Sequence, residues 1–131
     1  MIDVAMDVHV RNSFVHATDG SGQVIVKGRA GNTLLGLSEL LAPVERLARE
    51  RSEPVRMTIE NTTNARGILL LAARYGREAG IDLTARAVDP RKMRVIAESV
   101  CKCDRLDAQV LSELARSNLK LPVCYFPDDQ A

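Results

Sequence analysis

The sequence Lys-Cys-Asp-Arg-Leu-Asp-Ala-Gln-Val-Leu at residues 102–111 places two aspartates three positions apart. Apolar residues recur at helical spacing from there to Leu114, which predicts a helix over 104–117. Residues three apart share a helix face, so Asp104 and Asp107 are expected to point the same way from its first turn. Two neighbouring carboxylates repel each other unless a cation or a proton lies between them, and Mg²⁺ takes oxygen ligands of this kind.

An alternative interpretation of the same two acids needs no metal. Aspartate is a favoured N-cap, and an acid in the first turn complements the helix dipole. Asp104 would then be the cap, and Asp107 an ordinary acid at the third helical position. The positions of the other acids decide between these interpretations.

The composition describes one domain with an aliphatic core. The chain has 131 residues, of which 46% are hydrophobic and only 3% aromatic, so few rings are available to stack on bases. The net charge of +1 requires any nucleic-acid-binding surface to be local. No signal peptide or membrane-spanning run is evident, which predicts a cytoplasmic protein with reduced thiols. The spacing of Cys101 and Cys103 is not that of common zinc motifs.

Alternation of apolar and polar residues predicts a strand over 2–10 and a second over 13–17. The turn sequence Asp-Gly-Ser-Gly at 19–22 leads into a third strand at 23–27. The chain therefore opens with a three-strand antiparallel meander.

A βαβ unit is expected to follow. Asn32 or Thr33 caps a helix to about residue 51, with a kink or break at Pro43. A strand at 55–59 ends in Glu60. The helix after it stops at Gly80, and a strand at 81–88 should lie parallel to the strand at 55–59.

The remainder is expected to be a weak helix to residue 100, the acidic helix, and a tail. We predict a domain over 1–118, with 119–131 as a tail or the start of a linker. Basic residues gather between the last strand and the acidic helix, and we interpret them as nucleic-acid-binding through phosphate contacts. These residues are Arg91, Lys92, Arg94, Lys102 and Arg105.

Four acids fall where this scaffold can gather them. Asp7 lies in the first strand, Glu60 ends the fourth, and Asp104 and Asp107 begin the last helix. Four carboxylates in one cleft suit two metal ions, which clamp the attacking and leaving oxygens of a phosphoryl transfer.

Three stretches resemble DEDD-type transposases of bacterial insertion sequences, the family of the pilin-gene invertase Piv and of the bridge-RNA-guided recombinases. The stretches are Met-Asp-Val-His at 6–9, Glu-Asn-Thr at 60–62, and Asp-Pro-Arg at 89–91 leading to Lys-Cys-Asp-Arg-Leu-Asp-Ala at 102–108. The resemblance extends over nearly the whole chain, and its last stretch is the most specific.

The resemblance implies an α/β fold of the RuvC-like, ribonuclease-H type, with a mixed sheet and helices on both faces. It implies that Asp7, Glu60, Asp104 and Asp107 are catalytic and bind Mg²⁺ or Mn²⁺ for cleavage and exchange of DNA strands. It also implies DNA as the partner, a guide RNA in part of the family, and a homo-oligomeric full-length protein. The family's serine nucleophile belongs to a second domain, so we expect the 131-residue form to be an incomplete recombinase.

Two positions depart from the family pattern without removing an acid: Cys103 replaces a threonine, and Thr63 replaces a glycine. Two other functions stay open. One is a catalytically incomplete nucleic-acid-binding or assembly module of the same fold. The other is a nucleotide-binding fragment of the actin and sugar-kinase type, although no glycine-rich phosphate loop is evident.

Overall fold

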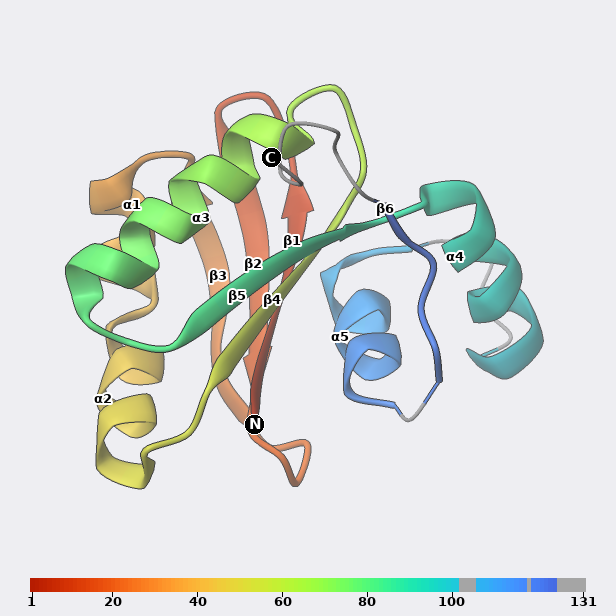
Figure 1. The fold of residues 1–131 in the computed structure, drawn as a ribbon. Helices are drawn as coiled ribbons and strands as arrows, with labels where there is room; N and C mark the ends of the chain where they lie inside the picture. The colour runs from red at the N-terminus through yellow and green to blue at the C-terminus, as the bar shows by residue number, and fades with distance from the viewer. Residues whose placement is uncertain (102–105, 118, 125–131) are drawn as a thin grey trace.

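The computed structural model describes residues 1–101, 106–117 and 119–124 (Figure 1). A six-stranded sheet forms its centre, in the order β3-β2-β1-β4-β5-β6. The strands are β1 (Ile2–Val8), β2 (Asn12–Thr18), β3 (Val24–Gly31), β4 (Val55–Glu60), β5 (Leu83–Val88) and β6 (Val123–Cys124).

The sheet is mixed, as predicted. Strands β1, β2 and β3 form an antiparallel meander, whereas β1, β4 and β5 run parallel to one another. The helix α3 (Ala65–Ala79) connects β4 to β5 and ends at Gly80, whose φ of 68° is the left-handed conformation that favours glycine at a helix end. The predicted βαβ unit is therefore confirmed.

The remaining helices are α1 (Leu34–Leu40), α2 (Ala42–Arg51), α4 (Pro90–Ile96) and α5 (Ala108–Arg116), and a π-helical turn, η1 (Ala97–Cys101), extends α4. The predicted break near Pro43 is confirmed, because α1 and α2 are separate helices and Pro43 lies in the first turn of α2. Thr33 caps α1 by accepting a hydrogen bond from the Gly36 amide at 2.9 Å.

Helices cover both faces of the sheet, with α1, α2 and α3 on one side and α4 and α5 on the other (Figure 1). Alternation along β1 explains the two layers. Ile2, Val4 and Met6 enter the larger core with α1–α3, whereas Ala5 enters a second core with residues of α4 and α5. This arrangement is consistent with the predicted ribonuclease-H-type fold.

Small side chains alternate with larger aliphatic ones on the buried face of α5, where Val110, Leu111 and Leu114 are also buried. Ala108, Ser112 and Ala115 of α5 are buried, as is Ala5 beneath the helix. Ala5 and Ala115 belong to the same core as Leu111. The helix therefore packs closely on β1, the strand that carries Asp7.

Two expectations for the C-terminal part were wrong. The last helix begins at Ala108 instead of 104, because Asp107 has extended φ and ψ and is itself the N-cap. The expected tail contains β6, which pairs with β5 through Val88 and Val123. The domain boundary at residue 118 stays a prediction.

Candidate metal and nucleic-acid site

Asp7 and Glu60 lie at the carboxyl-terminal ends of two neighbouring parallel strands. Met6 of β1 is in register with Ile59 of β4, so the next residue of each strand, Asp7 and Glu60, adjoin. Burial raises the pKa of Glu60, and the negative charge of Asp7 adds to the rise, whereas Arg94 opposes it. The two carboxylates thus interact electrostatically, which is the first condition for a shared cation.

One carboxylate oxygen of Glu60, Oε1, is buried and makes no hydrogen bond to the described residues. Burying a polar group without a partner is unfavourable, and more so when the group is charged. This oxygen therefore favours either a proton or a cation beside it.

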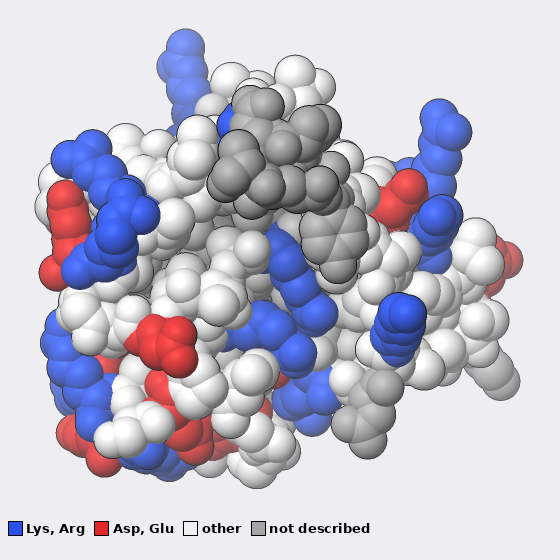
Figure 2. Space-filling model, viewed as in Figure 1, with Lys and Arg blue, Asp and Glu red and all other residues white. Residues whose placement is uncertain are grey.

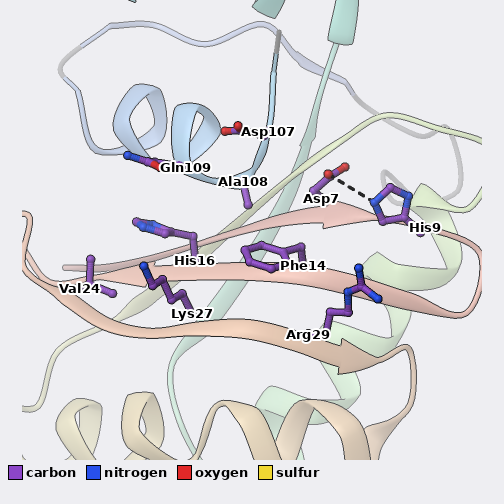
Figure 3. Close-up of a pocket in the computed structure, with 10 residues that line it drawn as sticks. All are labelled: Asp7, His9, Phe14, His16, Val24, Lys27, Arg29, Asp107, Ala108 and Gln109. Atoms are coloured by element: carbon purple, nitrogen blue, oxygen red, sulfur yellow. Dashed lines mark ion pairs between the residues drawn. The ribbon is translucent and has the colours of Figure 1, made fainter.

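Asp107 lies across a pocket from Asp7. Its carboxylate accepts a hydrogen bond from the Val110 amide at 2.9 Å, which fixes the side chain at the start of α5. Asp7 of β1 and Asp107 both line this pocket of about 610 Å³, and Figure 3 shows them on its β1 and α5 sides. Asp107 lies neither inside the first helical turn nor at the third helical position of the metal-free alternative, because it is the N-cap of α5, and it still lines the pocket with Asp7.

Asp104, Lys102 and Arg105 lie outside the described residues. Within the described part of the chain, no three His, Cys, Asp or Glu side chains gather closely enough to hold a metal ion. The structure therefore brings Asp7 and Glu60 together and sets Asp107 across the pocket from Asp7.

Two histidines also line this pocket. His9 Nε2 lies 3.4 Å from Asp7 Oδ2. His16 is half-buried, and its Nδ1 has no hydrogen-bond partner within the described ranges. Burial lowers the pKa of His16, the charge of Lys27 lowers it further, and the acids Glu113 and Asp107 act in the opposite direction.

The described basic residues that were predicted to contact nucleic acid have different neighbours. Asp89 caps α4 by accepting hydrogen bonds from the amides of Arg91 and Lys92. Arg94 acts electrostatically on Glu60, whereas Lys92 borders a separate, mainly apolar hollow. In Figure 2, basic side chains stand out from the surface over α4.

A buried polar cluster ties α5 to the sheet. Arg56 of β4 donates from Nε to Asp3 Oδ1 at 2.8 Å and from Nη2 to the carbonyl of Ala115 at 2.6 Å. Beside it, Arg86 of β5 donates to Thr58 Oγ1 at 2.9 Å. Because Ala115 lies in the last turn of α5, Arg56 fixes the position of the helix that carries Asp107.

Comparison with protein families matches residues 4–131 to a transposase family, the DEDD transposases of the IS110 type. The chain belongs to the IS110-type DEDD transposases. The resemblance drawn from the three motifs is therefore confirmed. Comparison with curated proteins gives no match.

Among the solved structures similar to this transposase-family chain are two bacterial proteins. The ethanolamine utilization protein EutJ from Carboxydothermus hydrogenoformans is 18% identical, with a TM-score of 0.45, over 76% of this chain and 41% of EutJ. The ROK hexokinase from Thermus thermophilus is 16% identical, with a TM-score of 0.43, over 79% of this chain and 39% of the kinase. The chain thus spans about two fifths of each, and likenesses this low transfer no function.

The acids of this DEDD chain suit a hard divalent cation by their chemistry, although the described ones do not gather as a set of three. Asp7, Glu60 and Asp107 offer carboxylate oxygens, which Mg²⁺ and Mn²⁺ prefer. The buried Oε1 of Glu60, which has no hydrogen-bond partner in the described part of the chain, is the observation that favours a cation. Asp7 and Glu60 are the residues best placed to begin such a site.

Sequence reasoning missed three further pocket residues of this transposase domain: Phe14 of β2 and Lys27 and Arg29 of β3. Alternation along the two strands was the available signal, since each residue lies on the face that also carries Asp7. Their alignment with Asp7 depends on the register of β3, which shifts near Thr18.

No helix in the described ranges is long and apolar enough to cross a membrane.

Proposed function

We propose that this chain is the metal-binding catalytic domain of a DNA transposase or site-specific recombinase, with Asp7, Glu60, Asp104 and Asp107 as metal ligands. Membership of the transposase family supports DNA as the substrate. The observation that carries the metal site is the buried Oε1 of Glu60 beside Asp7, which lacks a hydrogen-bond partner among residues 1–101, 106–117 and 119–124. A guide RNA and self-association remain predictions from the resemblance.

A bound divalent cation would polarise the phosphoryl oxygens and stabilise charge that develops during strand cleavage. The chain's own residues supply the binding site and its orientation. Asp7 and Glu60 provide adjacent oxygens from the rigid centre of the sheet, and Arg94 reduces the cost of ionising Glu60 while no cation is bound.

Asp107 is oriented from the other side of the pocket. Its hydrogen bond to the Val110 amide restricts its rotation, and Arg56 holds α5 against β4 through the Ala115 carbonyl. Rigid, preorganised ligands raise affinity because less conformational entropy is lost on binding. In the proposed site, Asp7 and Glu60 therefore come from strands, and Asp107 comes from the start of a helix.

The test is the thermal stability of the 131-residue chain in Mg²⁺ and, separately, Mn²⁺. A cation at ten times its Kd stabilises the folded state by about 1.4 kcal/mol, which corresponds to about 5 °C for a chain of this size. Asp7→Asn should remove most of this shift, because it removes one charge from the ligand set.

Asp82→Asn is the matched control. Asp82 is exposed and precedes β5 at the opposite end of the parallel strands from Asp7, so its variant should keep the full shift. If millimolar cation leaves the melting temperature unchanged, or if Asp7→Asn and Asp82→Asn behave alike, the metal site is refuted. The catalytically incomplete nucleic-acid-binding or assembly module then becomes the better proposal for the function of this chain.

A further inference from the structure

Two cross-strand rows of side chains run from the acidic site across the sheet. In the first row Asp7 of β1 is paired with Phe14 of β2, which is paired with Arg29 of β3. In the second row Ala5, His16 and Lys27 are paired in the same way. Directly paired residues share a face of the sheet, and apart from the buried Ala5 the residues of both rows form the floor of the pocket beneath α5 (Figure 3).

The β3 end of this floor is basic. Lys27 and Arg29 are exposed, and none of the ion pairs found among the described residues involves either of them. By contrast, the exposed Arg49 and Arg74 each lie near a glutamate of their own helix. Two unneutralised cations beside a pocket are suited to an anion supplied from outside.

The distance between the basic and acidic ends indicates which anion. Arg29 and Asp7 lie two strands apart, about 10 Å at the usual strand spacing. A phosphate held by Arg29 is therefore a different phosphate from one held at Asp7. A polymer with repeated phosphates can place one phosphate at Arg29 and another at the Asp7 end of the pocket at the same time.

Phe14 separates the two ends and is 41% exposed. The chain has only two phenylalanines, and this one presents its ring to a hollow surface between an arginine and an acid. Exposed aromatic rings beside cationic side chains are the surfaces on which unpaired bases stack. A duplex would keep its bases away from this ring, whereas a single strand can offer one.

We propose that Lys27, Arg29 and Phe14 form a binding site for a single DNA strand, with phosphates on the two cations and one unstacked base on the ring. This site rests on the proposed function, because the strand it holds is the one presented to the acids. The pocket volume of about 610 Å³ is in the range of small-ligand sites and suits part of one nucleotide.

The test uses fluorescence anisotropy in EDTA, so that binding does not depend on metal. One probe is a short labelled oligothymidylate, and the other is an abasic deoxyribose-phosphate strand of the same length. Wild type should bind the oligothymidylate about ten-fold more tightly than the abasic strand. Phe14→Ala and Phe14→Leu should both remove this preference, and the leucine variant keeps apolar bulk in case alanine disturbs the fold.

The double variant Lys27→Gln, Arg29→Gln should weaken binding of both probes by about ten-fold at low salt. It should also reduce the slope of log K against log salt by about 1.4, the value for two lost phosphate contacts on a single strand. Its matched control is Arg46→Gln, Arg77→Gln, which removes the same charge from exposed positions on α2 and α3, behind the sheet.

Three results would overturn this site: no binding by wild type at low salt, equal weakening by the control pair, or a base preference that survives both Phe14 variants. Each is separable from failure of the proposed function. The cation-induced stabilisation and its loss in Asp7→Asn are measured without DNA, and they do not involve Lys27, Arg29 or Phe14.

Discussion

Replacing Arg56 tests whether the buried polar cluster holds α5 in place. Arg56 is the hydrogen-bond partner of Asp3, whose side chain is 4% exposed, and it also binds the Ala115 carbonyl of α5. Arg56→Met keeps much of the apolar stem and removes both hydrogen bonds. Asp3 is then left as a buried acid without its closest cation.

The expected decrease in the free energy of unfolding follows from the loss of the Arg56–Asp3 ion pair. Removing one partner of a fully buried ion pair costs about 3–5 kcal/mol, and the 28% exposure of the Arg56 side chain places this pair at the lower end. The nearby Arg86, whose charge interacts with Asp3, compensates in part, so we expect a loss of about 3 kcal/mol in the free energy of unfolding. Adding Asp3→Asn removes the unpaired charge, and the double variant should recover about 2 kcal/mol relative to additivity.

The assay is equilibrium urea unfolding of wild type, both single variants and the double variant. Arg46→Met, an exposed position on α2, is the control and should change stability by less than about 0.5 kcal/mol. A coupling energy below about 0.5 kcal/mol between Asp3 and Arg56 would refute the reasoning.

Two further predictions concern groups away from the site. The Ser21 hydroxyl, with backbone amides, lowers the pKa of Asp19, so its stabilising effect should be present above an aspartate's ordinary pKa and lost as the pH falls through the lowered one. Asp19→Asn should therefore destabilise the chain near neutral pH but not in strong acid, as measured by urea midpoints across that pH range. Burial, then the hydrogen bond to Glu45 at 2.5 Å, raises the pKa of Tyr75 far above its usual range. Tyr75→Phe should cost about 2 kcal/mol in urea unfolding, and a loss below about 0.5 kcal/mol would show that Glu45 does not depend on this donor.

Much of the fold was predictable because its signals are local. Alternation identified β1 and β2, Pro43 marked the break between two helices, and Gly80 marked the end of α3. The two-residue strand β6 was missed because it is too short to show a period and depends on pairing with β5.

The candidate site was predictable only where an acid ends a strand. Asp7 and Glu60 follow from strand order, and their role as ligands stays a prediction. Asp107 was assigned to a helical position, because the sequence alone does not distinguish a cap from an acid inside the first turn. Lys27 and Arg29 were missed because their alignment with the acids depends on cross-strand register, which long-range pairing determines.

The close packing of α5 on β1 has a consequence for metal selectivity. Mg²⁺ requires ligand oxygens at about 2.0–2.1 Å, whereas Ca²⁺ accepts about 2.3–2.6 Å and more ligands. In the proposed site, the span between Asp7 on the strand and Asp107 on the helix depends on the layer between β1 and α5, to which the buried Ala5 contributes one methyl group. Discrimination between the two cations would thus depend in part on a methyl group outside the ligand set. A larger side chain at Ala5 would widen the span and shift preference toward the larger ion.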